Sequence, residues 1–212
     1  MDKAAILQRL LVPGIIAILR GKTADGMRGV VEALMAGGVC TMEVTMTTPG
    51  ALELIREVSQ AYGGRVLMGV GSVLDPETCR MALLAGAEFV VTPVVNREVI
   101  SMCNRYAKPI ACGAFTPTEA LAAHEAGADL VKIFPADTLG PSYIRNLLAP
   151  MPMLRLVPTG GVTPENARAY LKAGSVALGV GSSLVSGSVL ESRDWAGLEA
   201  TARRFVAAVE ER

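Results

Sequence analysis

Length, composition and charge exclude several classes of protein at the outset. The chain has 212 residues, of which 51% are hydrophobic and 19% are charged, and its formal net charge is zero. A chain this apolar is not disordered, and one without a basic stripe is a poor partner for nucleic acid or an anionic membrane. No stretch approaches the roughly 20 apolar residues of a membrane span, and residues 1–11 lack the features of a signal peptide.

The cysteines and the single histidine give no indication of a metal site. The four cysteines show no CxxC or other metal spacing and are typical of reduced, buried residues of a cytoplasmic protein. His124 falls on a predicted helix and is expected at the surface. We therefore expect no metal and a cytoplasmic location.

Short apolar runs alternate with helical patterns along the whole chain. Most of the runs are apolar throughout and do not alternate with polar residues, as in parallel strands that are buried on both faces. In chain order the predicted strands are residues 14–20, 41–46, 66–73, 88–94, 109–114, 129–134, 154–158 and 177–180.

The helices between these strands have clear start and stop signals. Asp75-Pro76, Thr116-Pro117 and Thr163-Pro164 each place a capping oxygen before a proline at the first helical position. Glycines such as Gly86 and Gly127 follow helical runs and lead into strands. Eight such units predict a single-domain (β/α)8 TIM barrel of parallel strands over residues 1–212. A doubly wound open sheet would normally carry a GxGxxG turn after the first strand, which this chain lacks.

Lys132 lies in the middle of an apolar strand, where an unpaired ammonium group is costly. A buried lysine tends to lose its proton, and a neutral amine is a nucleophile toward carbonyl carbon. Because side chains alternate across a strand, Leu130, Lys132 and Phe134 are expected on one face, with Val131 and Ile133 on the other. The alternative is a lysine whose head group reaches solvent at the strand end.

Two further charges belong to apolar strands, and function in a barrel gathers at the carboxyl ends of its strands. Glu43 lies in the second predicted strand, close to Thr45, and Arg20 ends the first. Either could belong to a structural ion pair, yet three charges on one rim are hard to explain by stability alone, which apolar residues would serve as well.

Glycine-rich segments follow the seventh and eighth predicted strands. The residues Thr159, Gly160 and Gly161 follow one strand, and Gly181 and Ser182 follow the other. Barrels often bind phosphate with these two loops, because glycine lets backbone N–H groups approach the anion. Each segment could be only a turn, but together they predict a phosphorylated ligand.

These motifs, taken in order, resemble the class I 2-keto-3-deoxy-6-phosphogluconate (KDPG) and 4-hydroxy-2-oxoglutarate (KHG) aldolases. The resemblance extends over residues 11–185. The motifs are specific to this family when they occur together in this order. The segments that carry it are Ile16-Ala17-Ile18-Leu19-Arg20, Met42-Glu43-Val44-Thr45, Gly69-Val70-Gly71-Ser72-Val73-Leu74, Val131-Lys132-Ile133-Phe134-Pro135-Ala136 and Pro158-Thr159-Gly160-Gly161-Val162.

The resemblance implies a role for each matching position. Lys132 would form the Schiff base and Glu43 would shuttle protons, with no metal and no cofactor. The expected substrate-binding residues are Arg20, Thr45, Ser72, Pro93, Phe134, Thr159, Gly160, Gly161, Gly181 and Ser182. The family is commonly trimeric, so a homotrimer is expected.

One position departs from the pattern of some members. They carry an arginine four residues after the glutamate, where it helps to hold the substrate carboxylate, and this chain has Thr47 there. Carboxylate binding by Arg20 is the expected substitute, and the substrate subtype stays open.

The reaction implied is cleavage of a phosphorylated 2-keto-3-deoxy sugar acid to pyruvate and glyceraldehyde 3-phosphate. Cleavage of 4-hydroxy-2-oxoglutarate to pyruvate and glyoxylate is a second expected activity. The alternatives are the 6-phosphogalactonate epimer as substrate, a phosphosugar isomerase or epimerase in which Lys132 is only a charge clamp, and a non-catalytic phosphosugar-binding barrel.

Overall fold

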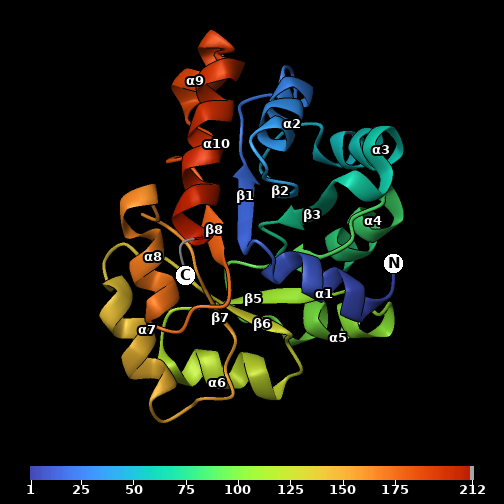
Figure 1. The fold of residues 1–212 in the computed structure, drawn as a ribbon. Coiled ribbons are helices and arrows are strands. Elements are labelled where there is room, and N and C mark those ends of the chain that lie inside the picture. The colour runs from blue at the N-terminus through green and yellow to red at the C-terminus, as the bar shows by residue number, and fades with distance from the viewer. Residues whose placement is uncertain (211–212) are drawn as a thin grey trace.

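A computed structural model describes residues 1–210 as eight parallel strands surrounded by helices (Figure 1). Each predicted strand is present, and most are shorter than predicted by one or two residues at an end. The strands are β1 (Ile15–Leu19), β2 (Thr41–Thr45), β3 (Leu67–Gly71), β4 (Val90–Val91), β5 (Ile110–Ala114), β6 (Leu130–Ile133), β7 (Leu156–Pro158) and β8 (Leu178–Val180). The largest difference is β4, predicted over residues 88–94 but paired over two residues.

The strands follow the order β7-β6-β5-β4-β3-β2-β1-β8, and every pairing in that series is parallel. A parallel bridge between Thr159 and Gly179 brings β7 back beside β8. The sheet thus closes nearly into a ring, which confirms the predicted barrel and excludes the open doubly wound sheet.

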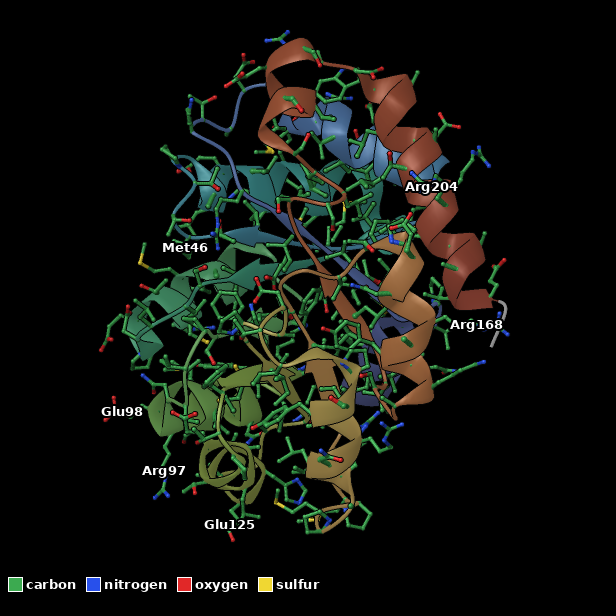
Figure 2. All side chains as sticks on the ribbon, turned by 90° about the vertical axis from the view of Figure 1, so that its left-hand side faces the viewer. Met46, Arg97, Glu98, Glu125, Arg168 and Arg204 are labelled. Carbon is green, nitrogen blue, oxygen red and sulfur yellow. The ribbon has the colours of Figure 1, made fainter. Side chains whose placement is uncertain are left out.

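The helices surround this ring. They are α1 (Lys3–Leu11), α2 (Met27–Ala36), α3 (Ala51–Tyr62), η1 (Gly63–Arg65), α4 (Pro76–Ala85), α5 (Arg97–Arg105), α6 (Pro117–Glu125), α7 (Gly140–Leu148), α8 (Pro164–Lys172), α9 (Gly187–Ser192) and α10 (Trp195–Glu210). The last helix packs on α2 and α8, and Arg204, labelled in Figure 2, forms an ion pair of 2.7 Å with Glu165 at the start of α8. No helix within residues 1–210 is both long and apolar enough to cross a membrane.

The predicted capping signals are used as expected. Asp75 accepts a hydrogen bond from the N–H of Thr78, and Thr116 forms a reciprocal capping box with Glu119. Gly86 ends α4 with a φ of 111°, a left-handed conformation that favours glycine.

The interior of the barrel is divided into two layers. We call the apolar layer next to α1 the lower layer, and the polar layer at the carboxyl ends of the strands the upper layer. Inward-facing side chains of the strands, among them Leu67, Phe89, Leu130 and Val157, form one buried cluster with Ile6 and Leu10 of α1. Val131 and Ile133, which point the other way, belong to the larger cluster between the sheet and the helices. Because the lower layer is filled by apolar side chains, a binding site can open only at the carboxyl ends of the strands.

Candidate active site

Lys132 lies in β6 and faces the barrel interior. It is 8% exposed and its neighbours in the sheet register are Gly113 of β5 and Val157 of β7. Leu130, two residues earlier, belongs to the interior cluster, so the predicted alternation is confirmed. Burial rules out the alternative in which the ammonium group reaches solvent at the strand end.

Glu43 lies in β2, four strands away around the ring, and so approaches from the opposite wall. It is 1% exposed, and neither carboxyl oxygen has a hydrogen-bond partner among the described residues. Gly71 of β3 makes room for it, because a Cβ atom at that position would lie 2.7 Å from Oε1 of Glu43. The carboxyl group thus occupies space that any side chain at position 71 would take.

Lys132 and Glu43 face one small internal cavity. The other residues in its wall are Ile16, Ile18, Val91, Ala111, Val157, Thr159 and Gly179. An amine and a carboxyl group therefore meet in a largely apolar chamber.

Burial sets the protonation of both groups. Desolvation raises the pKa of Glu43, and the nearby charges of Lys132 and Arg20 oppose this rise. Desolvation also lowers the pKa of Lys132; the Glu43 carboxylate opposes this shift, whereas the Arg20 guanidinium adds to it. Both groups are driven toward their uncharged forms, which for the lysine is the nucleophilic form.

Arg20 was predicted as a charge embedded in the first strand, but the structure places it outside that strand. β1 ends at Leu19, and Arg20 is exposed just beyond it. Its side chain borders two cavities at the mouth of the barrel, of about 300 Å³ and about 720 Å³. It still influences the charge of both buried groups, so it belongs to the site as a residue of the rim.

The smaller of these two cavities contains the predicted glycine loops. Gly160 and Gly161 have φ angles of 97° and 67°, a conformation that favours glycine. The predicted residues in its wall are Arg20, Phe134, Thr159, Gly160, Gly161, Gly181 and Ser182. The structure therefore brings seven of the twelve predicted site residues, as given in the sequence analysis, around this one cavity.

Phe134 also contacts the lysine. Nζ of Lys132 lies 5.1 Å from the centroid of the Phe134 ring, within the range of a cation–π interaction. A positive charge on that nitrogen would be stabilised by the ring face.

Three predicted residues line none of these three cavities. Ser72 follows β3 with a φ of 58°, the backbone of Pro93 packs against Gly113, and Thr45 hydrogen-bonds to other threonines. Thr92, which precedes Pro93, accepts a hydrogen bond from the N–H of Gly113 and so holds the loop that carries Pro93.

The larger cavity was not predicted. Its wall combines Arg20 and Thr47 with the loop after β1 and with α9. Two ion pairs connect that loop to the region of α9: Lys22 with Glu191 at 3.5 Å, and Arg193 with Asp25 at 2.6 Å. These pairs join residues almost 170 positions apart, so neither motif nor periodicity could have revealed them.

Within residues 1–210, no group of three or more His, Cys, Asp and Glu side chains has the arrangement of a metal site. His124 lies on α6, as expected. The groups that the structure brings to this site are an amine, a carboxyl group, a guanidinium and backbone N–H groups.

Known proteins resemble this chain in sequence and in fold. Residues 6–201 match the family described as KDPG and KHG aldolase. A 2-dehydro-3-deoxy-6-phosphogalactonate aldolase of Escherichia coli K12 is 39% identical over 80% of this chain and 83% of its own length. A 2-dehydro-3-deoxy-phosphogluconate aldolase of Pseudomonas aeruginosa is 34% identical over 81% and 78%.

Among solved structures, a cube-shaped, highly porous protein cage designed by fusing symmetric oligomeric domains superimposes with a TM-score of 0.86. It is 36% identical, and the match covers 93% of this chain and 72% of that one. With a family match over most of its length and relatives above 30% identity, the chain belongs to the KDPG and KHG aldolase family of lyases.

Proposed function

We propose that the protein is a Schiff-base aldolase that cleaves 2-keto-3-deoxy-6-phosphogluconate to pyruvate and glyceraldehyde 3-phosphate. The observation that carries the proposal is the burial of Lys132 opposite Glu43 in one chamber. An amine whose pKa is lowered by burial can attack a ketone, and a carboxyl group without protein partners is free to exchange protons with the substrate.

The reaction begins when the neutral amine of Lys132 attacks the C2 ketone. Loss of water gives an iminium ion, which withdraws electrons as the C3–C4 bond breaks. Glu43 moves protons during iminium formation and accepts the C4 hydroxyl proton during cleavage. Protonation at C3 and hydrolysis of the imine then release pyruvate and restore the amine.

The carboxylate and the phosphate at the two ends of the substrate would bind to different parts of the barrel rim. Arg20, with Ser72 nearby in the family pattern, would hold the carboxylate. The loops with Gly160, Gly161 and Gly181 would hold the phosphate through backbone N–H groups. Cleavage of 4-hydroxy-2-oxoglutarate, which has no phosphate, would use the same amine without these loops.

Trapping the imine tests the proposal directly. Borohydride reduction in the presence of pyruvate should attach a three-carbon adduct to Lys132, detectable by peptide mass mapping. Lys132→Ala should abolish the adduct and nearly all turnover, and Glu43→Gln should lower turnover by about 100-fold or more. A phosphosugar isomerase or a non-catalytic binding barrel would give no adduct, and an adduct on another lysine would also refute the assignment.

A second candidate substrate is the C4 epimer, 2-keto-3-deoxy-6-phosphogalactonate. The 39% identity to the E. coli phosphogalactonate aldolase favours it. The kcat/KM values for the two epimeric acids decide between the two substrates. We expect the value for the gluconate epimer to be at least tenfold higher. A higher value for the galactonate epimer would show that the protein is a phosphogalactonate aldolase instead.

We also propose a homotrimer, formed through an apolar surface around α4. Leu74, Met81, Leu84 and Val94 are each more than half exposed there, an unusual density of apolar side chains for a free surface. Arg97 and Glu98, at the start of α5, point away from the molecule in Figure 2 and line one pocket with Pro76 at the start of α4. The symmetric oligomeric domains of the related cage support a second copy of the chain as its occupant.

Light scattering on purified protein tests this surface. Wild type should have the molar mass of a trimer, and Leu84→Glu should give monomers because it places a charge in an apolar contact. Met153→Glu, at an exposed apolar residue elsewhere, should remain trimeric. A monomeric wild type would refute the trimer, and a trimeric Leu84→Glu would refute the location.

The pH dependence of lysine reactivity follows from burial. Because the pKa of Lys132 is lowered, its modification by an amine-specific reagent should reach half its maximal rate below pH 10.5. The Glu43 carboxylate raises this pKa, so Glu43→Gln should move the profile to lower pH. Peptide mass spectrometry across a pH series, with the Lys22 peptide as a reference for reagent activity, measures both. A profile that moves to higher pH in the variant would contradict this account.

The four free cysteines support a reducing, cytoplasmic location for the reaction. Cys79, Cys103 and Cys112 are buried, and none of the four forms a disulfide.

A further inference from the structure

The aromatic ring of Phe134 lies beside the amine of Lys132. Phe134 comes directly after β6, two residues beyond Lys132 and therefore on the same inward face. Nζ of Lys132 lies 5.1 Å from the centroid of the ring. Lys132 is 8% exposed and Phe134 is 37% exposed, so the ring borders both the buried amine and the open cavity of about 300 Å³.

Backbone hydrogen bonds to both neighbouring strands hold Phe134 in this place. The N–H of Phe134 donates to the carbonyl of Ala114 at the end of β5, at 3.0 Å. The carbonyl of Ile133 accepts a hydrogen bond of 2.9 Å from the N–H of Thr159, just beyond β7. Pro135 follows and restricts the backbone of Phe134 further. The barrel framework therefore sets the place from which the ring extends.

The proposed reaction creates a positive charge on the nitrogen beside this ring. In the carbinolamine, Nζ of Lys132 is bonded to C2 of the substrate. The C2 hydroxyl takes a proton from Glu43 and leaves as water, and the lone pair of Nζ becomes the second C–N bond of the iminium ion. Cleavage depends on this charge, because the iminium ion accepts the electron pair of the C3–C4 bond.

The chamber offers this charge little other compensation. Apart from Lys132 itself, the residues in its wall are apolar or uncharged except for Glu43. The charge of Glu43 changes as it exchanges protons, and the Arg20 guanidinium opposes a positive charge on Nζ. The negative face of an aromatic ring, in contrast, is present at every step.

A ring at this distance stabilises the iminium ion more than the free amine. An aromatic face attracts a cation within about 6 Å of its centroid, most strongly where the cation is desolvated. Burial lowers the pKa of Lys132 and favours the neutral amine, which gains little from the ring. An interaction that strengthens as the reaction proceeds raises the rate, whereas one made equally with both states does not.

We propose that Phe134 is a catalytic residue whose ring stabilises the Lys132 iminium ion, and the transition states on either side of it, by a cation–π interaction. This inference rests on the proposed aldolase function and adds an electrostatic role to it. A ring that only covered the amine, or only contacted the substrate, would act through its apolar surface. The proposed role depends instead on the electrons of the ring face.

Fluorination of the ring separates these two roles, because each fluorine withdraws electrons from the ring face and changes the shape of the ring little. Phe134 is replaced by phenylalanines with one, two or three ring fluorines, incorporated at an amber codon. The reaction measured is exchange of the pyruvate methyl hydrogens in deuterium oxide, which requires the iminium ion and its enamine but no sugar acid. We expect kcat/KM for exchange to fall stepwise, to about one tenth of the wild-type value with three fluorines.

Natural substitutions and a matched second site complete the comparison. Phe134→Leu, which keeps an apolar side chain without a ring, should lower kcat/KM for exchange about tenfold, and Phe134→Tyr should stay within about threefold. The ring of Tyr106 is 39% exposed, lies 4.1 Å from the guanidinium carbon of Arg80 and lines none of the three cavities of the site. Trifluorophenylalanine at position 106 should leave exchange unchanged. Thermal melting confirms that each variant is folded.

Protonation of Lys132 gives a second readout. The ring face also favours the ammonium form of the lysine, so three fluorines on Phe134 should move the pH profile of Lys132 modification to lower pH. A ring that acts only by excluding water would leave this profile unchanged.

The outcomes distinguish this inference from the aldolase proposal. If wild type exchanges the methyl hydrogens and forms the borohydride-trapped adduct, but the exchange rate does not depend on the number of fluorines, the inference alone is overturned. An equal fall with trifluorophenylalanine at position 106 would also overturn it. If wild type neither exchanges nor traps pyruvate, the inference is overturned together with the proposed function.

Discussion

The removal of one amine and one carboxyl group from water, on facing strands of a closed barrel, is the constraint on which the rest of this structure depends. A buried ion without a partner costs several kcal/mol, and replacing such a pair by apolar side chains often stabilises a protein. For Lys132 and Glu43, burial outweighs their mutual attraction in setting both pKa values. Stability alone does not account for such a pair, whereas a reaction that needs an unprotonated amine and a mobile proton does.

Small residues in the lining of the barrel make room for larger neighbouring side chains, and one of these is the Glu43 side chain of this pair. Glycine stands at inward-facing positions of several strands, and in three cases a neighbouring group occupies the space of the missing Cβ. The ring of Phe89 fills it at Gly69, the carboxyl group of Glu43 at Gly71 and the hydroxyl of Thr159 at Gly179. In the lower layer, apolar side chains of the barrel pack against Ile6 and Leu10 of α1. The same eight strands thus form a packed core at one end and a chamber at the other.

The sequence was sufficient to predict the elements and the two buried charges, because both depend on local patterns. Continuous apolar runs indicated each strand, and capping residues such as Asp75 and Thr116 indicated where helices begin. A charge within such a run, as at Lys132, is visible without a structure. Residues at strand ends were less predictable: Arg20 was expected within its strand but lies beyond it, since its exposure depends on where pairing with β2 stops. The chamber that Gly71 provides and the cavity closed by α9 arise from contacts between distant segments, for which a single sequence carries no signal.

The mouth of the barrel is divided into two unlike halves, one apolar and one polar, and this division bears on the proposed trimer. Exposed apolar side chains, Leu74, Val94 and Phe115, follow the adjacent strands β3, β4 and β5. Arginine, threonine and glycine follow β1, β2, β7 and β8, and these residues line both larger cavities. Because β1 and β8 are neighbours in the ring, the groups suited to a carboxylate and those suited to a phosphate share one continuous arc. A second copy docked on the apolar half would leave this arc open to solvent, so a substrate with two anionic ends could enter while the subunits stay associated.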